Sequence, residues 1–438
     1  MSSTRPTMRA VGAVPAYPDI KSYSPIWNEL RVWEGDGWQR ESLSWKESAY
    51  VAANLIGRME FVITGPEAQK LLSQLSINNV WKWPVGRSKH LVMLSEDGTI
   101  ANHALAVRDS EQQFRTLAGL PWPLIQAERL GMDVRIEARK IFILQIAGPK
   151  SLLVLEAMLE QSLSNVAFLD VVPIQVPGVE GAVELSRIGM AGTLAYEIRG
   201  AYDLGPAVYD AVYQAGRRWD IVRLGWRTYA VNHTEGGFPQ LNVTFLPSMV
   251  FDPAVAGTRM ESLSAPLSGS IPADDIRARL RTPQEVNWAW MGKLDHDFIG
   301  RDAFEREVAE PRRKTVTLRW DPDDVTDVFA SQLKSGEPYK FIEFPVSPQQ
   351  PAGGHADLVT KGGQAVGVSS AVVYSYYYRE LLSQATVDLE EAEIGNTVIV
   401  HWGDHGHRIK QIRATVERFP YLDLPRNEDY DVDTAKRS

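Results

Sequence analysis

The sequence contains no cysteine. This absence excludes a disulfide framework, a thiolate metal site and a cysteine nucleophile. No apolar run approaches the roughly 20 residues that a membrane-spanning helix needs, and residues 1–17 lack the apolar core of a secretory signal. These absences predict a cytoplasmic protein that has no membrane partner.

Other absences concern nucleotides, nucleic acids and metals. No Gly-x-Gly-x-x-Gly opens a helix after a strand, so a dinucleotide or flavin domain is unsupported. The net charge of −9 at pH 7 argues against a nucleic-acid partner, because general nucleic-acid binders carry a basic surface. The three histidines between His401 and His407 match no standard zinc spacing, and we therefore expect no metal site.

A duplicated pattern is the first positive signal. The chain of 438 residues is long enough for two or three domains, and its composition is that of a globular protein. Residues 59–75 and 141–159 each contain an apolar strand, a Gly-Pro break and an amphipathic helix that begins at the proline. The repeat predicts two similar α+β halves packed together.

A hairpin is predicted between the two copies, at residues 90–107. Its two strands are joined by Asp97 and Gly98, a turn pair that strongly favours a hairpin. Side chains alternate between the faces of a strand, so Asn102 and His103 should point to opposite sides. Only one of them is then expected to face a site, and Asn102 is the favoured candidate.

The most informative stretch begins at Gly181 and ends at Pro239. Its first half carries Gly189 and Gly192, which permit a tight turn before a new strand that begins near Glu197. A carboxylate there can accept two parallel N–H donors from a planar heterocycle such as a pterin or a guanine. Residue type alone favours a different interpretation, an exposed glutamate at a strand end.

Three motifs carry a family resemblance. The run from Arg187 reads Arg-x-Gly-x-x-Gly-x-x-x-Tyr-Glu-Ile, and the run from Leu224 begins Leu-Gly-Trp-Arg and ends in Glu-x-Gly. Together with the Lys-Leu-Asp-x-Asp-Phe-Ile-Gly-Arg run from Lys293, they resemble the folate-binding core of the aminomethyltransferase (glycine-cleavage T-protein) superfamily. Within it, the chain resembles the tetrahydrofolate-dependent O-demethylases of methoxylated aromatic acids. The resemblance spans residues 49–421.

The resemblance implies an α+β fold in which a duplicated ferredoxin-like folate-binding core is followed by a C-terminal β-barrel. The expected divisions are an irregular N-terminal arm at 1–48, the core of two intertwined halves at 49–310, the barrel at 311–425 and an acidic tail at 426–438. The residues themselves also favour a barrel, because short alternating strands with turn signals follow residue 310. The expected strands are 315–320, 341–344, 365–373, 383–389 and 397–402.

The resemblance further implies tetrahydrofolate as cofactor. Glu197 matches the position that grips the pterin, Tyr196 stands beside it, and Arg227 matches a residue of the same folate site. Arg227 could bind either folate or an aromatic carboxylate.

Two departures from the family pattern bear on the chemistry. Asn102 stands where the family carries an aspartate, and an amide cannot supply the charge that holds a cationic aminomethyl donor. A neutral methyl-ether donor is therefore favoured, and Asn102 is expected both to hold the reactive face of the pterin and to act in catalysis. Leu55 stands where many relatives carry histidine, so no acid or base can be carried over there.

His103 and Tyr229 are the candidate proton donors to the departing phenolate. A phenol can both donate a hydrogen bond and stack, but Tyr229 could equally be a packing residue of a helix that begins at Arg227. His103 likewise has a structural alternative, since it could face away from the site.

The expected function is a tetrahydrofolate-dependent O-demethylase that moves the methyl group of an aromatic methyl ether, a methoxybenzoate, to tetrahydrofolate. The products would be 5-methyltetrahydrofolate and a phenol. Three alternatives share the fold: a demethylase of a sulfonium or amine donor, a glycine-cleavage-type aminomethyltransferase, and a non-catalytic folate-binding module. The partner is in each catalytic case a small molecule.

Overall fold

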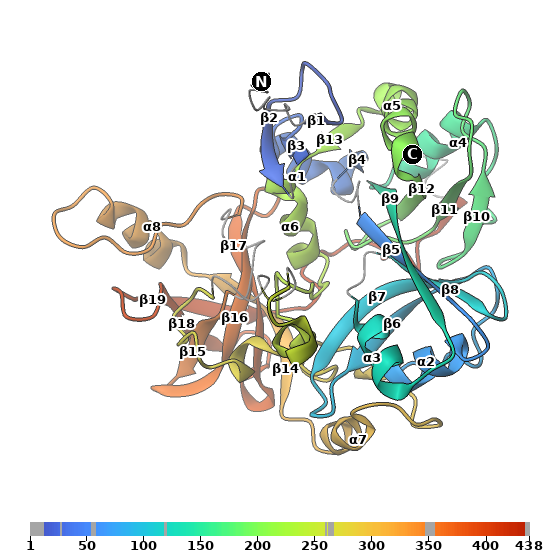
Figure 1. The fold of residues 1–438 in the computed structure, drawn as a ribbon. Helices are drawn as coiled ribbons and strands as arrows, with labels where there is room; N and C mark the ends of the chain where they lie inside the picture. The colour runs from blue at the N-terminus through green and yellow to red at the C-terminus, as the bar shows by residue number, and fades with distance from the viewer. Residues whose placement is uncertain are drawn as a thin grey trace, which may run out of the picture.

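A computed structural model describes most of the chain, and a curled sheet and a closed barrel dominate it. The described residues are 13–26, 29–53, 58–117, 121–258, 261, 267–346 and 355–433. Leu55 lies outside them. The sheet and the barrel lie on opposite sides of the molecule, with helix α6 (Trp226–Glu235) between them (Figure 1). Within the described ranges, no helix has both the length and the apolarity that crossing a bilayer requires.

The N-terminal segment is more regular than expected. It forms a three-stranded sheet in the order β1-β3-β2 and one helix. These elements are β1 (Ala13–Val14), β2 (Ser22–Ile26), β3 (Glu29–Glu34) and α1 (Trp38–Glu47). The prediction of an irregular arm was therefore wrong. The proline and tryptophan content concealed the alternating run Glu-Leu-Arg-Val-Trp-Glu, which pairs with strands on both sides.

The duplicated pattern forms the two units that it predicts. The first is β5 (Arg58–Thr64) followed by α2 (Ala68–Leu75), and the second is β9 (Arg135–Ala147) followed by α4 (Ser151–Leu159). A Gly-Pro pair separates strand from helix in both. The first half of β9 pairs with β5 and its second half with β12, so one long strand joins the two halves into a single sheet.

The sheet runs in the order β10-β11-β12-β9-β5-β8-β7-β6, and β4 and β13 extend it beside β9. The remaining strands are β4 (Tyr50–Ala52), β6 (Ser88–Leu94), β7 (Ile100–Arg108), β8 (Gln113–Leu117), β10 (Val171–Ile174), β11 (Val183–Ser186), β12 (Ala195–Ala201) and β13 (Val222–Leu224). Strands β6 and β7 form the hairpin predicted at the Asp-Gly turn.

Helices pack against each half of this sheet. The remaining helices of the core are α3 (Trp122–Leu130), α5 (Gly205–Gly216) and α7 (Arg301–Ala309). Helices α4 and α5 pack against β9 and β12, while α2 and α3 pack beside β6 and β8. Short 3-10 helices lie at Tyr202–Leu204, Arg217–Trp219, Ser248–Phe251, Pro253–Val255, Arg277–Arg279, Ala289–Met291 and Leu389–Glu391.

The C-terminal barrel is confirmed. It closes in the order β14-β17-β16-β15-β18-β19 around an apolar interior. Its strands are β14 (Arg313–Trp320), β15 (Asp357–Lys361), β16 (Gln364–Ser375), β17 (Glu380–Asp388), β18 (Thr397–Trp402) and β19 (Lys410–Glu417). Because α7 ends at Ala309 and β14 begins at Arg313, we propose that the core and the barrel divide between them.

The barrel differs from its prediction in three places. Residues 341–344 are not a strand, because they lie between Pro338 and Pro345 and proline cannot donate to a strand ladder. Strands β15 and β19 were not predicted. Helix α8 (Pro322–Ser331) was also missed, although Asp321 caps it by accepting hydrogen bonds from two backbone N–H groups of the first turn.

The C-terminal end of α6 is held by a buried carboxylate. Glu235 forms an ion pair of 2.5 Å with Lys46 of α1, and the two side chains are 0% and 1% exposed. It also accepts hydrogen bonds from Trp45 Nε1 at 3.0 Å and from Ser375 Oγ of β16 at 2.6 Å. Burial lowers the pKa of Lys46 to about 8, and the charge of Glu235 opposes this shift. One carboxylate thus joins the N-terminal segment, α6 and the barrel.

A second buried carboxylate holds the N-terminal end of the same helix. Glu41 of α1 accepts hydrogen bonds from the backbone N–H of Gly225 at 3.0 Å and from Thr228 Oγ1 at 2.8 Å. Its other oxygen accepts from Gly35 N at 2.8 Å. Burial raises the pKa of Glu41 to about 6, although these donors favour the ionised form. A carboxylate at a helix N-terminus also complements the helix dipole.

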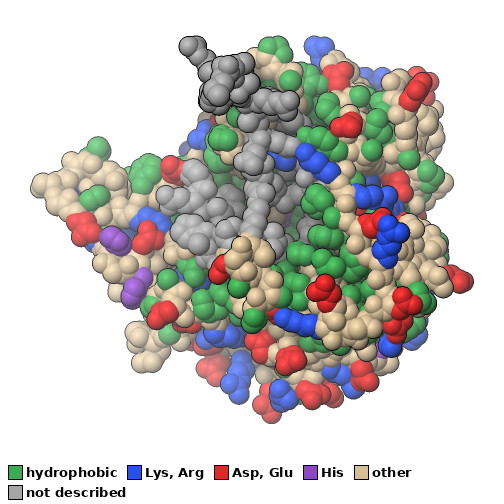
Figure 2. Space-filling view, in the orientation of Figure 1, with side chains coloured by type: hydrophobic (Ala, Val, Ile, Leu, Met, Phe, Trp, Pro, Cys, Tyr) green, Lys and Arg blue, Asp and Glu red, His purple; other side chains and the backbone are tan. Residues whose placement is uncertain are grey.

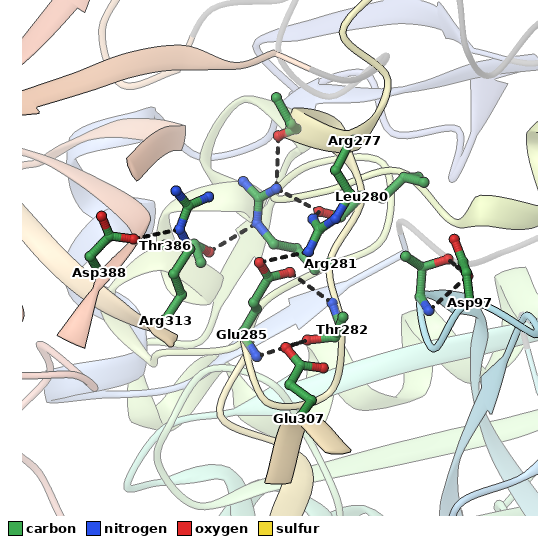
Figure 3. Close-up of polar contacts among 12 residues, drawn as sticks. Asp97, Arg277, Leu280, Arg281, Thr282, Glu285, Glu307, Arg313, Thr386 and Asp388 are labelled. Atoms are coloured by element: carbon green, nitrogen blue, oxygen red, sulfur yellow. Dashed lines mark hydrogen bonds and ion pairs between the residues drawn. The ribbon is translucent and has the colours of Figure 1, made fainter. Parts of the chain in front are cut away.

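Polar contacts also join the barrel to the rest of the chain (Figure 3). Arg281 donates from Nε to Thr386 Oγ1 of β17 at 2.9 Å. Nearby, Arg277 pairs with Glu285 at 2.9 Å, and Arg313 of β14 pairs with Asp388 at 2.7 Å. Charges of both signs are likewise interspersed over the molecular face in Figure 2, with hydrophobic side chains gathered toward its middle.

We predict that Glu235→Gln lowers the free energy of unfolding by about 3–5 kcal/mol, because it leaves the buried Lys46 ammonium without its counter-charge. Equilibrium unfolding in urea measures the change. Asp220→Asn is the matched control, since it removes the exposed ion pair with Arg40 and should cost less than about 1 kcal/mol. Equal costs for the two variants would contradict a special role for Glu235.

Candidate functional site

Glu197 lies in the middle of the sheet. Strand β12 runs between β11 and β9, and the partners of Glu197 in register are Ser186 and Gln145. Gln145 Nε2 donates to the Glu197 carboxylate at 3.2 Å, and Glu197 is only 6% exposed. Burial raises the pKa of Glu197, whereas the charge of Arg199 and the hydrogen bond from Gln145 lower it. The side chain is therefore a buried carboxylate and not an exposed strand-end glutamate.

The glycine turn before β12 brings this strand against the end of α6. Gly192 has a φ of +74°, and a Cβ there would lie 2.9 Å from the Cα of Gly236. A Cβ on Gly189 would lie 2.3 Å from the Cβ of Ala195, which closes the turn. Only glycine permits so close an approach, as the sequence pattern indicated.

Helix α6 supplies the polar neighbours of Glu197. Asn232 Nδ2 donates to Tyr50 Oη at 3.1 Å, and both side chains are buried. Burial raises the pKa of Tyr50 well above its ordinary value, and the charges of Tyr229 and Glu197 act in the same direction. Glu197, Tyr50, Tyr229 and Asn232 thus form one buried polar cluster between β12, β4 and α6.

His233 adds a hydrogen-bond acceptor to this cluster. Its Nδ1 lies 3.1 Å from the backbone oxygen of Tyr229, and because a carbonyl only accepts, Nδ1 carries the proton. Its Nε2 is then a bare acceptor. This atom is buried, and no donor among the described residues reaches it. Burial lowers the pKa of His233 to about 4, so the ring is neutral at pH 7.

A cavity of about 720 Å³ is linked to the polar cluster through Phe238, which lines the cavity and whose ring contacts that of His233. No residue of the cluster lines the cavity itself. Its inner wall is built from flat rings, among them His103, Phe238 and Trp288. The ring centroids of His103 and Trp288 are 4.6 Å apart, and those of His103 and Phe238 are 5.8 Å apart. Phe238 also lies 5.9 Å from His233, which connects the cavity wall with the cluster on α6.

The charged residues of the lining, here called the outer lining because most of them are exposed, are mainly basic. Four cations line it against two carboxylates: Lys82, Lys89, Lys293 and Arg426 against Asp295 and Glu428. Asp295 lies 3.5 Å from Lys82, and Glu428 lies 3.0 Å from Arg426. Lys89 and Lys293 have no carboxylate partner in the part of the chain that the structure describes. Burial and the charge of Lys293 lower the pKa of Lys89. The cavity opening, where these basic residues lie, therefore suits a ligand that ends in carboxylates.

Two histidines of the hairpin meet in the cavity wall. His90 Nδ1 lies 3.0 Å from His103 Nε2, and the two rings stack with centroids 5.1 Å apart and an interplanar angle of 10°. Burial lowers the pKa of His90 to about 4 and that of His103 well below its ordinary value. Both rings are therefore neutral at pH 7.

The predicted site residues on the hairpin separate as strand alternation requires. His103 lines the cavity, whereas Asn102 is fully buried, does not line this cavity, and places Nδ2 3.8 Å from the sulfur of Met93. The expectation that the two residues point to opposite faces is met. Of the described residues that were predicted for the site, only His103 lines this cavity. Asn102, the favoured candidate, does not, and neither do Glu197, Tyr196, Arg227 and Tyr229.

The other predicted residues occupy three different environments. Tyr196 points to the face of β12 opposite Glu197 and is fully buried in the apolar core under α4 and α5. Tyr229 lies in helix α6, with its ring 4.6 Å from that of His233. Arg227 lies in the first turn of the same helix but pairs with Glu34 at 2.5 Å and donates to the backbone oxygen of Phe344 at 3.0 Å.

Several residues of the site were not predicted: Tyr50, Gln145, Asn232, His233, His90, Phe238 and Trp288. Asn232 and His233 stand inside the motif that begins at Leu224, and their spacing from Tyr229 on a helix could have identified them. Nothing in the local sequence marks His90, because only the pairing of β6 with β7 brings it to His103.

The duplicated sheet, the closed barrel and a buried carboxylate beside an aromatic cavity define a protein of the aminomethyltransferase fold. The solved aminomethyltransferase T of the glycine cleavage system from Bartonella henselae shares this fold, with a TM-score of 0.66 over 93% of this chain and 94% of that chain at 16% identity. Residues 22–245 match the GCVT N-terminal domain.

Two curated relatives match over nearly their whole length. The chain is 34% identical over 420 residues to the sesamin methylene transferase of Sinomonas sp. (strain No.22), covering 92% of each protein. It is 26% identical over 422 residues to the syringate O-demethylase of Sphingobium sp. (strain NBRC 103272 / SYK-6), covering 90% of each. The protein belongs to the aminomethyltransferase (glycine-cleavage T-protein) family, and it is an enzyme whose cofactor is tetrahydrofolate.

The site fits tetrahydrofolate on its own chemistry. The bare Nε2 of His233 and the carboxylate of Glu197 are buried acceptors, and a pterin presents N–H donors. The cavity volume is that of a ligand pocket, and its ring-lined wall suits an aromatic group. The glutamate end of the cofactor carries two carboxylates, which match Lys89 and Lys293. Lys89 donates to the backbone oxygen of Asn79 at 2.8 Å, and neither lysine has a carboxylate partner among the described residues.

We predict that His233 contributes to acid sensitivity. Its folded-state pKa lies below the unfolded value, so the unfolded chain binds more protons and stability is lost as pH falls below about 6.5. Between pH 7 and pH 5.5, this one group should remove about 1 kcal/mol from the free energy of unfolding. His233→Leu should flatten that pH dependence by the same amount in urea unfolding, whereas His407→Gln, at an exposed position, should not. An unchanged slope in His233→Leu would contradict the prediction.

Proposed function

We propose that the enzyme transfers a one-carbon unit from an aromatic ether to tetrahydrofolate, and that its donor is a methyl ether of the methoxybenzoate type. The products are then 5-methyltetrahydrofolate and a phenol. The neutral inner wall of the cavity carries this proposal. Phe238, Trp288 and the two neutral histidines line it, while the charges lie in the outer lining. A neutral aromatic ring fits such a wall.

The same wall argues against the cationic alternatives, which carry their charge beside the transferred carbon. A cationic aminomethyl or sulfonium donor would lose its hydration there, and burying a charge without a counter-charge is costly. A methoxybenzoate carries its charge on a carboxylate at the edge of the ring, which can face the basic part of the lining. The names of the two curated relatives also support transfer from aromatic ethers.

The residues that would hold the cofactor divide between the two ends of the site. Glu197 and His233 would accept from the pterin, with Tyr229 and Tyr50 around them. Tetrahydrofolate, when bound, supplies the amine that accepts the one-carbon unit. Arg227 would have to leave Glu34 to reach a ligand, so we place the carboxylates of the glutamate end at the basic opening instead.

The protein has two tasks in the reaction. An aryl methyl ether is inert because phenolate is a poor leaving group, so the site must align the donor with the acceptor and deliver a proton to the ether oxygen. The ring-lined wall does the first by fixing the plane of the donor. His103 is our proposed proton donor because it lines the cavity, and Tyr229 is the second candidate.

A second donor class is favoured by one observation, the 34% identity to a sesamin methylene transferase. A methylenedioxyphenyl donor would occupy the same wall. Its carbon would arrive on the cofactor as a methylene bridge, which gives 5,10-methylenetetrahydrofolate and a catechol. The two candidates thus differ in the oxidation level of the transferred carbon.

Anaerobic incubation of the purified enzyme with tetrahydrofolate tests both candidates. The panel contains methoxybenzoates, methylenedioxyphenyl compounds, dimethylsulfoniopropionate and glycine-derived donors, and mass spectrometry follows both folate products. Methyl-folate with a matching phenol supports the methyl-ether proposal, and methylene-folate with a catechol supports the second candidate. Product from a sulfonium or amine donor alone would overturn both.

We predict that Glu197→Gln weakens tetrahydrofolate binding at least tenfold, or about 1.4 kcal/mol, because an amide cannot accept two parallel N–H donors. Isothermal titration calorimetry measures the affinity. Glu137→Gln, an exposed glutamate of strand β9, is the matched control and should bind normally. Normal binding by Glu197→Gln would remove Glu197 from the cofactor site.

The orientation of the cofactor gives a separate prediction. The double variant Lys89→Met, Lys293→Met should bind tetrahydrofolate roughly tenfold more weakly, because the two carboxylates lose their partners. Its affinity for a tetrahydropterin without the glutamate end should equal that of the wild type. If both ligands lose affinity equally, the carboxylates do not lie at this opening.

A further inference from the structure

We infer that His90 and His103 form a two-imidazole proton relay that supplies the proton for the departing oxygen, with His90 acting through His103. The inference rests on the proposed function, because it assumes that an ether oxygen meets His103 in the cavity. It adds a residue, His90, that neither the motifs nor the family resemblance indicates.

The strand pairing fixes the geometry of the pair. In the antiparallel register of β6 and β7, His90 lies opposite Leu105 and His103 lies opposite Val92. The two histidines are therefore diagonal neighbours on one face of the hairpin, within reach of long or aromatic side chains. The two ring nitrogens are 3.0 Å apart and the rings are nearly parallel, so the two histidines form a hydrogen bond.

The contact constrains the protons. Two ring nitrogens 3.0 Å apart share one hydrogen, so when His90 Nδ1 donates, His103 Nε2 accepts and His103 carries its own hydrogen on Nδ1. In the opposite arrangement His103 donates and His90 carries its hydrogen on Nε2. Both arrangements are neutral. The outer nitrogens, those outside this contact, are His90 Nε2 and His103 Nδ1. In the first arrangement the outer hydrogen is on His103 Nδ1, and in the second it is on His90 Nε2.

The outer nitrogens are available to the cavity. His90 and His103 both line it, and the structure shows no hydrogen bond from His90 Nε2 or His103 Nδ1 to any described residue. Phe238 and Trp288 pack against the rings and offer no acceptor from their faces. Glu428 lines the same cavity and its charge acts on His90. The pair therefore has one end toward the inner wall and the other near an acidic group.

The proton balance of the step follows from this arrangement. The carbon–oxygen bond breaks toward oxygen, which keeps the electron pair and takes the hydrogen from His103 Nδ1. His103 Nε2 then takes the hydrogen from His90 Nδ1, and His90 Nε2 regains one from water. The hydrogen displaced from the amine of the bound cofactor would leave to water, which balances the protons. Hydrogen transfer through both rings in one step avoids an imidazolium in a wall that disfavours charge.

Packing alone explains the pair less well. Two apolar aromatic rings would stack in this wall without the desolvation cost of four ring nitrogens, of which only two satisfy each other. The pair keeps two unpaired nitrogens at the surface of a cavity. Two such nitrogens are what a relay needs, because one gives a hydrogen to the ligand while the other takes one from water.

The first test is steady-state kinetics with ring-substituted ethers. His90→Phe keeps a stacked ring but removes the nitrogen, and it should lower kcat about 100-fold for an electron-rich methyl ether, the usual scale of acid catalysis. The loss should shrink below tenfold for a nitro-substituted ether, whose phenolate leaves without a proton. KM for tetrahydrofolate should stay within twofold. His405→Phe, at an exposed position of the barrel, is the control and should retain full activity.

Chemical rescue separates relay from packing. Added imidazole should raise the kcat of His90→Ala at least tenfold. 1-Methylimidazole, which has no N–H to pass on, should leave that kcat unchanged. Equal rescue by both compounds would show that the ring merely fills space. A loss of kcat in His90→Phe that is the same for all ethers would likewise overturn the relay.

A third readout needs no activity. Nitrogen-15 NMR of histidine-labelled protein without ligands should show two neutral rings joined by an N–H···N bond at pH 7, and His90→Phe should abolish that bond. Separate, unbonded rings would contradict the inference. A wild-type enzyme that accepts carbon from none of the donors would overturn the proposed function and the relay together, whereas an active wild type with unaffected variants would overturn the relay alone.

Discussion

The structure depends on how one helix is held at both ends. Helix α6 lies between the N-terminal segment, the sheet and the barrel, and each end meets a buried carboxylate. Glu41 accepts from the Gly225 N–H and the Thr228 hydroxyl at its start, and Glu235 pairs with Lys46 at its end. Burying these charges is expensive unless each is fully satisfied. Because the partners come from the N-terminal segment, the barrel and the helix itself, these contacts fix the helix against both the segment and the barrel.

That position determines the site. The same helix presents Tyr229, Asn232 and His233 to the cluster around Glu197, and the turn at Gly192 lies directly against its end. Outward from the cluster, the surroundings change from buried acceptors to neutral rings and then to lysines. This sequence of environments matches a ligand with a polar heterocycle at one end and carboxylates at the other. It leaves the neutral middle for an aromatic ether.

Local signals predicted much of this, and most of what they missed depends on distant partners. The Gly-Pro units at 59–75 and 141–159 and the Asp-Gly hairpin at 90–107 are each encoded in a short stretch of sequence, and the barrel was indicated by its short strands with turn signals. The sheet at residues 13–34 and the strands at 357–361 and 410–417 gain their identity from distant partners. Likewise Glu197 stands in a motif, whereas His90 and Trp288 join the site only through tertiary packing.

The most direct test of the account is a single turnover under anaerobic conditions, with excess enzyme, tetrahydrofolate and a methoxybenzoate that carries a trideuterated methyl group. The account predicts that methyl-folate with all three deuterium atoms forms in equal amount to the phenol. Methylene-folate with two deuterium atoms from a matching labelled methylenedioxyphenyl donor, and none from the methyl ether, would replace the donor class. A phenol without labelled folate, or no phenol from either donor despite bound cofactor, would contradict the central claim.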